Sequence, residues 1–186
     1  LEYYHKAVEV DPNYDNALFE LGYIYNERGE AQKAIQYYTK AANLNPKKDV
    51  LNNLGLAYSK LEDYPNAEKW YKKSLDLDPN YAIALNGLGL VKWKQKQHND
   101  AEYWYKRAIK ADSGYYLAYY NLGILYEAQK NQEEAKTYYK KAISLNPKYA
   151  NAMINLGILY ETKEKNFQEA ENWYKKAVDA DPRSHL

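Results

Sequence analysis

The chain has 186 residues, and its 26 lysines and arginines nearly balance 25 aspartates and glutamates, for a formal net charge of +1. This balance gives no electrostatic reason to expect nucleic acid or a strongly charged protein as the partner. The absence of cysteine excludes disulfides, thiolate zinc sites and thiol nucleophiles, and no apolar run is long enough to span a bilayer.

Taken in chain order, the sequence first predicts one helix and a turn, and then five units of two helices each. The first segment, residues 1–14, contains Tyr4, Ala7 and Pro12 in the phase of a second helix. Repetition at a fixed period indicates a stacked array, because one helix pair cannot bury its apolar face alone. The five units are residues 15–47, 48–81, 82–115, 116–149 and 150–184.

The first helix of each unit is marked by a Leu-Gly pair. Glycine in a helix interior costs roughly 0.5–1 kcal/mol relative to alanine, so five glycines in phase require a packing reason. We therefore predict that this row is a close contact between helices, where a larger side chain would overpack. Its members, spaced by 33, 34, 34 and 34 residues, are Gly22, Gly55, Gly89, Gly123 and Gly157.

The second helix is marked by an alanine, a tyrosine four residues later and a small residue three further on. These positions share one helical face. The helix should end where Asp-Pro or Asn-Pro follows, because the residue before proline disfavours the helical conformation. The tyrosines are Tyr38, Tyr71, Tyr105, Tyr139 and Tyr174, and the prolines are Pro46, Pro79, Pro147 and Pro182.

Four local departures interrupt this pattern. One residue is missing near Lys47, in the turn between two units, and one is extra near Lys165, between the helices of the last unit. Both fall in connections, where a change of length is tolerated. In the third unit Lys92 replaces a tyrosine and Ser113-Gly114 replaces the proline turn, so we expect a looser turn there.

The Leu-Gly–x–x–Tyr, Ala–x–x–x–Tyr–x–x–Ala and Pro series resembles the tetratricopeptide repeat over essentially the whole chain. The resemblance implies an all-α solenoid of antiparallel helix pairs, with about five and a half repeats in a right-handed superhelix. It also implies a concave groove lined by the first helices. We expect a single array over residues 1–186, cut from a longer protein because it begins at Leu1 and neither end resembles a polar capping helix.

Mapping the groove positions of the family onto the chain places asparagine before the leucine in three of five units. Such a row, formed by Asn53, Asn121 and Asn155, would offer amide donors and acceptors to the backbone of an extended peptide. It is similar to the asparagine ladder in the repeat region of O-linked GlcNAc transferase. The alternative is that these residues are solvated polar positions that bridge helices.

Further groove positions carry aromatic, amide and acidic side chains. Exposed aromatics on a concave wall are typical anchors for a partner, and Trp93 stands out because the equivalent positions in the other units are polar. By contrast, Trp70, Trp104 and Trp173 recur in the second helix, which indicates packing. The remaining candidates for partner binding are Phe19, Tyr23, Asn52, Asn86, Tyr120, Glu127 and Glu161.

The residues that several other functions require are missing from the sequence. In related repeats that clamp the C-terminal carboxylate of a chaperone, the third of three adjacent first helices supplies a basic pair, and this chain has no basic pair at those positions. His5, His98 and His185 are too widely separated to suggest a metal site. No phosphate-binding glycine loop or nucleophile triad is present. Lysine pairs such as Lys72-Lys73 recur on one face of the second helix and should point to solvent. We predict no catalytic site and no cofactor.

We therefore predict a scaffold that binds a protein or an extended peptide in its groove, without nucleic acid, membrane insertion or a carboxylate-clamp ligand. Two alternatives remain open. The array could present substrates to a larger enzyme of the O-GlcNAc transferase type, or it could be an architectural part of a large assembly. Edge-to-edge self-association is a further possibility of an array with open ends. The absence of cysteine is compatible with the cytoplasm, which is the expected location.

Overall fold

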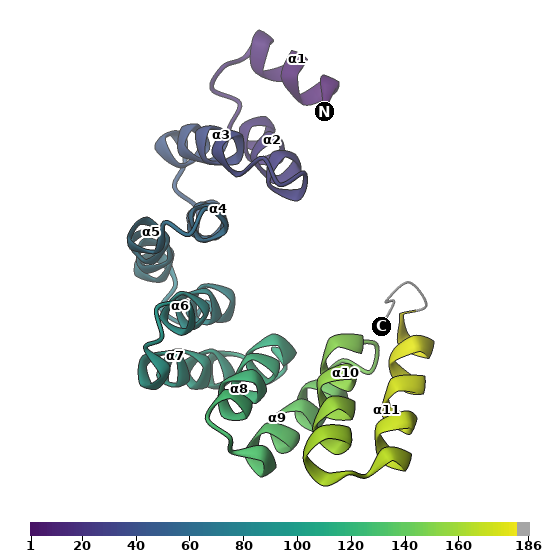
Figure 1. The fold of residues 1–186 in the computed structure, drawn as a ribbon. Helices are drawn as coiled ribbons and strands as arrows, with labels where there is room; N and C mark the ends of the chain where they lie inside the picture. The colour runs from purple at the N-terminus through teal and green to yellow at the C-terminus, as the bar shows by residue number, and fades with distance from the viewer. Residues whose placement is uncertain (182–186) are drawn as a thin grey trace. The chain divides into compact units, whose positions relative to one another are not determined.

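The computed structural model describes residues 1–181, and every regular element in that part of the chain is helical (Figure 1). Internal contacts group the chain into two compact units, the first covering Leu1–Ala101 and the second beginning at Glu102. The boundary lies inside helix α7, His98–Ala111. No helix of residues 1–181 combines the length and apolar character that a membrane crossing needs. Pro182 and His185 lie outside the described residues.

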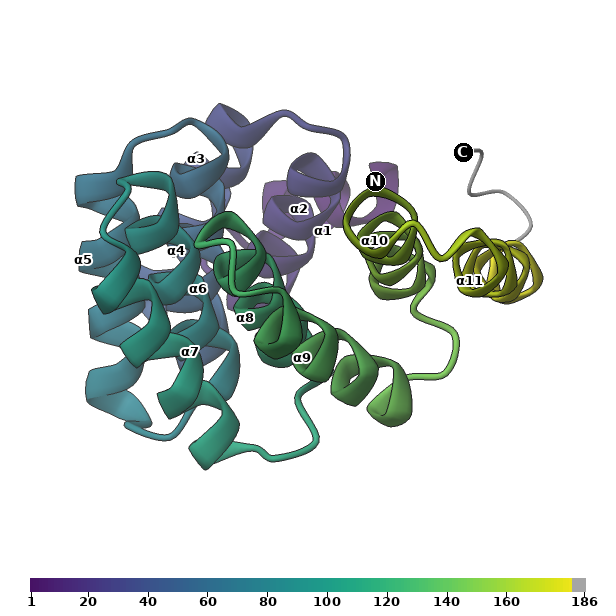
Figure 2. The ribbon, with the colours of Figure 1, turned by 60° about the horizontal axis from the view of Figure 1, so that its bottom comes forward.

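The first unit contains one single helix, two complete helix pairs and the first helix of a third pair. The first helices α2, α4 and α6 lie on one side of this unit and α3 and α5 on the other (Figures 1 and 2), and α4 contacts both α2 and α6. The helices are α1 Glu2–Val10, α2 Asp15–Glu27, α3 Ala31–Leu44, α4 Lys48–Lys60, α5 Tyr64–Leu77 and α6 Ala82–Lys94.

The second unit contains most of α7 and two further helix pairs. Helix α9 packs between its own partner α8 and the next first helix, α10. The helices are α8 Tyr116–Ala128, α9 Gln132–Leu145, α10 Ala150–Leu159 with the π-helical turn η1 Tyr160–Glu164, and α11 Phe167–Ala180. The predicted all-α solenoid of helix pairs is confirmed.

The predicted close contact between helices is a tyrosine ring lying on a glycine. A Cβ atom added to Gly22 would lie 2.6 Å from Cδ1 of Tyr38, and one added to Gly55 would lie 2.7 Å from Cδ1 of Tyr71. Tyr38 is fully buried. The ring thus occupies the volume that a side chain on the first helix would need, and this sets how closely the two helices of a repeat approach. Gly123 with Tyr139 and Gly157 with Tyr174 form the same contact.

The turn between the two helices of a repeat contains one residue in the left-handed conformation. This residue is Gly29 in the first complete repeat, with φ of 78°, and a lysine or glutamate in the others. In repeat four the amide of Asn131 then donates to the carbonyl of Tyr126, five residues back. In the last repeat Asn166 donates to Tyr160, six residues back. The extra residue predicted near Lys165 is therefore accommodated by η1, which prolongs the first helix.

The four-residue turns that precede α2, α6, α8 and α10 share one hydrogen bond that does not depend on proline. Asp78 accepts from the amide of Asn80, and Asp112 accepts from the amide of Gly114 at 2.8 Å. The expectation of a looser turn at Ser113-Gly114 is therefore wrong, because the aspartate side chain closes the turn as it does elsewhere. The missing residue is confirmed, since residues 45–47 connect α3 to α4 where residues 78–81 connect α5 to α6.

The substitution Gly55→Ala tests whether the glycine contact sets the helix spacing. The ring of Tyr71 has little room to yield, because it also lies against Gly87 of the next first helix, where an added Cβ would lie 2.5 Å from Cε1. Overpacking by about 1–3 kcal/mol should outweigh the ~1 kcal/mol gained from helix propensity, so the free energy of unfolding in urea should fall.

The matched control is Gly114→Ala, where the added Cβ meets only Oδ1 of Asp112, at 3.3 Å. It should change stability by no more than about 0.5 kcal/mol. An unchanged or higher stability of Gly55→Ala would show that the ring yields and that the contact does not fix the helix spacing.

Candidate functional site

The predicted groove residues lie on the first helices of the repeats and differ widely in exposure. Tyr23 on α2 is 48% exposed, whereas Asn52 on α4 and Asn86 on α6 are each 5% exposed. Phe19 and Tyr120 are half-buried, and their rings tilt against Tyr38 and Tyr139 of their own repeats. The buried asparagines therefore support the wall from within, and the half-buried and exposed side chains form its surface.

The asparagine row contacts the tyrosines of the second helices. Nδ2 of Asn155 donates to the hydroxyl of Tyr120 at 3.3 Å and to that of Tyr139 at 3.4 Å. Asn155 thus connects α10 to both helices of the preceding repeat, which agrees with the helix-bridging interpretation. It does not exclude a ligand, because both bonds use the amide nitrogen and leave the carbonyl oxygen to accept.

In the second repeat the position of Asn155 is occupied by Asn53, which shows how the asparagine row relates to the buried tyrosines. Burial raises the pKa of the Tyr38 phenol above its usual range, and the neighbouring Asn53 amide opposes that shift. In the third repeat the position is Gly87, where an added Cβ would meet the ring of Tyr71. The position therefore faces the phenol of the preceding repeat. Asn121, 9% exposed, occupies it in repeat four.

The predicted acidic positions also hold these phenols. The hydroxyl of Tyr139 donates to Oε2 of Glu127 at 2.6 Å, and the hydroxyl of Tyr174 donates to Oε2 of Glu161 at 2.7 Å. The equivalent position in repeat three is Trp93, whose half-buried ring packs edge-on against His98 at 4.9 Å. Each phenol that contacts one of these carboxylates is held as a neutral donor, because ionising it would place two negative charges together.

The tryptophans of the second helices carry a lysine or, at Trp104, an arginine over their rings. Nζ of Lys73 lies 4.4 Å from the ring centre of Trp70, and Nζ of Lys176 lies 4.1 Å from that of Trp173. The lysine pairs are exposed, as predicted. This cation–π packing on the outer helices agrees with a scaffold role for these tryptophans.

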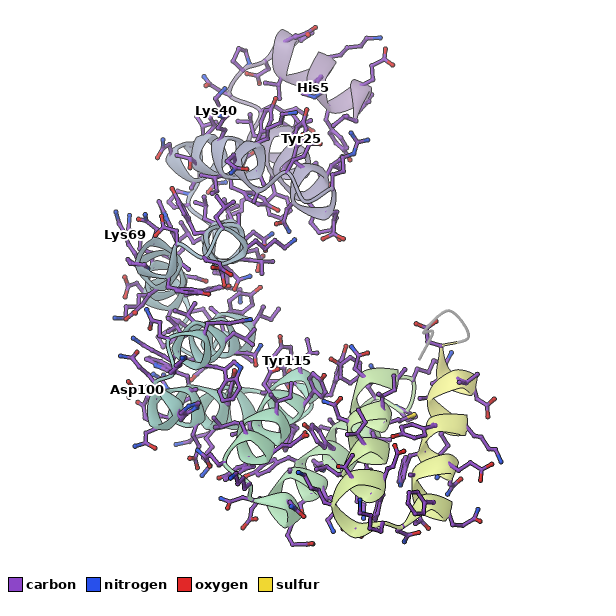
Figure 3. All side chains as sticks on the ribbon, in the orientation of Figure 1. His5, Tyr25, Lys40, Lys69, Asp100 and Tyr115 are labelled. Carbon is purple, nitrogen blue, oxygen red and sulfur yellow. The ribbon has the colours of Figure 1, made fainter. Side chains whose placement is uncertain are left out.

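At the start of the chain, α1 is attached to the first complete repeat by a histidine and two tyrosines. Nε2 of His5 lies 3.0 Å from the hydroxyl oxygen of Tyr25 (Figure 3). The rings of Tyr25 and Tyr37 stack at 5.4 Å. This cluster explains how a single helix is held against α2 and α3 without a partner helix of its own.

A cavity of about 240 Å³ opens between α2, the end of α3 and the start of α4. The predicted groove residue Phe19 forms part of its lining, together with Asn16, Glu20 and Asp49. The cavity itself was not predicted. The signal for it in the sequence is the missing residue near Lys47, because a shorter connection leaves space between the helices that it joins.

Family models described as tetratricopeptide repeat match residues 3–36, 49–114, 116–149 and 138–172. Anaphase-promoting complex subunit 3 of Schizosaccharomyces pombe is 30% identical over 82 residues, which are 44% of this chain and 12% of that protein. The UDP-N-acetylglucosamine–peptide N-acetylglucosaminyltransferase of Giardia intestinalis is 33% identical over 76 residues, 40% of this chain and 5% of that enzyme. The chain thus spans a small part of either relative.

Among solved structures, the crystal structure of MamA matches with a TM-score of 0.69 and 28% sequence identity. The match covers 88% of this chain and 95% of that one. The arrangement of helix pairs described above is therefore shared with a solved protein over most of both chains.

The tyrosines predict a loss of stability at alkaline pH. Burial raises the pKa of Tyr115 and of Tyr149 from 10.0 to about 12 in the folded chain, and burial also raises the pKa of Tyr38, Tyr105 and Tyr139. A raised folded pKa contributes stability below the unfolded pKa, and this contribution is lost as pH rises through the folded value. The free energy of unfolding should therefore fall from about pH 10 upward.

The measurement is denaturant unfolding at a series of pH values, with tyrosinate absorbance recorded in parallel. The absorbance should rise in two stages, the second together with loss of helical circular dichroism. Complete ionisation of all tyrosines in one stage near pH 10, with the helices intact, would contradict the assignment of buried neutral phenols.

Proposed function

The chain belongs to the tetratricopeptide repeat family, and from this we propose that it is a protein-interaction scaffold that binds an extended segment of a partner protein along its first helices. Support comes from Asn155, whose amide nitrogen is held by two phenols while its carbonyl oxygen can accept from a backbone N–H. A fixed amide loses little conformational entropy on binding.

Each unit would contribute its own part of the binding surface. In the first unit the exposed ring of Tyr23 and the half-buried ring of Phe19 lie on α2, and Asn53 lies on α4. In the second unit Tyr120 and Asn121 lie on α8 and Asn155 on α10. Aromatic anchors with amides beside them suit a segment that is held mainly by its backbone.

The similarity to the Giardia transferase favours one second candidate, in which the array presents protein substrates to a glycosyltransferase. Both uses need the same surface. They differ in outcome, because partners captured by a presenting array would be substrates for GlcNAc transfer by the protein purified from its native source. If the protein does not modify the captured partners, the outcome supports the scaffold function and contradicts the substrate-presenting one.

The test of the proposed function is a triple substitution of Asn53, Asn121 and Asn155 to alanine, used in affinity capture from the native source. Partner recovery should fall at least tenfold, because three backbone contacts of about 0.5–1.5 kcal/mol each are lost. Circular dichroism of the variant should show that its helices remain.

The matched control replaces three exposed asparagines of the second helices, Asn43, Asn99 and Asn172, with alanine. This control should recover partners as the unaltered chain does. Equal recovery by both triple variants would overturn the groove proposal in favour of an architectural part that binds through its edges or outer helices.

A further inference from the structure

The residue that directly precedes each first helix follows a pattern with one exception. It is a tyrosine before four of the first helices, namely Tyr14, Tyr81, Tyr115 and Tyr149, and it is Lys47 before α4. The exception coincides with the connection that is one residue shorter than the others. The α3–α4 junction therefore lacks a ring that the other junctions have.

At two other junctions this ring covers the start of the preceding first helix. The hydroxyl of Tyr81 donates to Oδ1 of Asp49 at 2.6 Å. The ring of Tyr149 packs edge-on against Tyr116 at 4.8 Å and against Tyr120 at 5.0 Å. In the repeat register, Tyr116 and Tyr120 are the equivalents of Asp15 and Phe19.

At the α3–α4 junction Lys47 reaches toward the same place without filling it. Its Nζ lies 3.1 Å from Oδ2 of Asp15 and 3.4 Å from Oδ1 of Asn16. The cavity of about 240 Å³ is lined by Asp15 and Phe19, so it lies where Tyr149 packs in the second unit. The cavity is the space of the missing ring.

The lining combines apolar residues, of which Ala41 and Val50 are buried, with acidic residues that are half-buried or exposed and are called its rim. Phe19, Ala41 and Val50 supply the apolar contacts, whereas Asp15 and Glu20 supply carboxylates. Asp49 adds a third carboxylate, and Lys47 is the single cation of the lining. The volume is below the roughly 300–1,000 Å³ of sites for drug-sized ligands, so the cavity suits one side chain.

We propose that this cavity is a binding pocket for a tyrosine side chain of the partner segment. The inserted ring would pack on Phe19 as Tyr149 packs on Tyr120, and its hydroxyl would donate to a rim carboxylate as Tyr81 donates to Asp49. Phosphorylated tyrosine would be rejected, because its dianion would face three carboxylates and only one ammonium group. This inference rests on the proposed function and names one anchor of the partner.

The test uses N-acetyl-tyrosine amide as the probe and methyl NMR of the full chain as the readout. Saturable shifts are expected at the methyl groups of Ala41 and Val50, which line the cavity, and not at Ala142, the equivalent of Ala41 beside the filled junction. N-acetyl-alanine amide should give no shifts, and the phosphorylated probe should bind at least tenfold more weakly.

The decisive variant is Lys47→Tyr, which restores the ring to the junction. It should abolish the shifts and leave the melting temperature unchanged or higher, and its control is Lys40→Tyr at an exposed position of α3. No shifts with the unaltered chain, equal binding by Lys47→Tyr, or equal binding of the phosphorylated probe would each overturn the pocket.

These outcomes are distinguishable from failure of the proposed function. The probe can bind a chain whose triple asparagine variant still captures every partner, in which case the pocket stands and the backbone-binding surface fails. Conversely, loss of capture by that triple variant without any probe binding supports the surface and removes the pocket.

Discussion

The contact on which the rest of the structure depends is the tyrosine ring that lies on the glycine of its own repeat. It sets the approach of the two helices, because the ring fills the space of the absent side chain. It also carries a phenol into the stack, and a buried hydroxyl without a partner costs roughly 1–3 kcal/mol. Each buried phenol therefore poses the same problem, which is where its hydroxyl finds a hydrogen bond, and the repeats solve it to different extents, because the hydroxyl of Tyr38 is buried without a partner.

The solutions to that problem include residues at the predicted groove positions, so stability and the proposed binding depend on the same side chains. Glu127 and Glu161 accept from the phenols of their own repeats, and Asn155 donates to the phenol of the preceding one. These contacts fix the rotamers of the groove side chains. For the proposed function, side chains held in this way would be preorganised, which would reduce the entropy lost when a partner segment binds.

The contacts that follow from the spacing of the repeat were predictable from the sequence, whereas the exposure of single side chains and the cavity were not. The glycine and the tyrosine of which Gly55 and Tyr71 are examples recur in register, so their contact could be predicted from the sequence. Asn52 and Tyr23 are both polar first-helix residues of the same predicted surface, yet one is 5% and the other 48% exposed. Asn52 lies two residues before the leucine of its repeat and Tyr23 two residues after, so the two side chains occupy different positions of the first helix, and how far neighbouring repeats cover each position is not part of the repeat pattern. The cavity beside Lys47 could be predicted only by comparing the junctions with one another, because it lies where the tyrosine of the other junctions is missing.

Two residues that depart from the repeat pattern, Gly87 and Lys47, show which positions the stacked helix pairs need and which they tolerate in another form. Gly87 stands where three other repeats have asparagine, and there the ring of Tyr71 takes the space of the side chain. The stack therefore does not require an amide at this position. Lys47 stands where other junctions have tyrosine, and the fold keeps its helices there while leaving a cavity. Both positions therefore tolerate change without loss of the helix pair, whereas the glycine beneath a tyrosine ring is constrained by that ring.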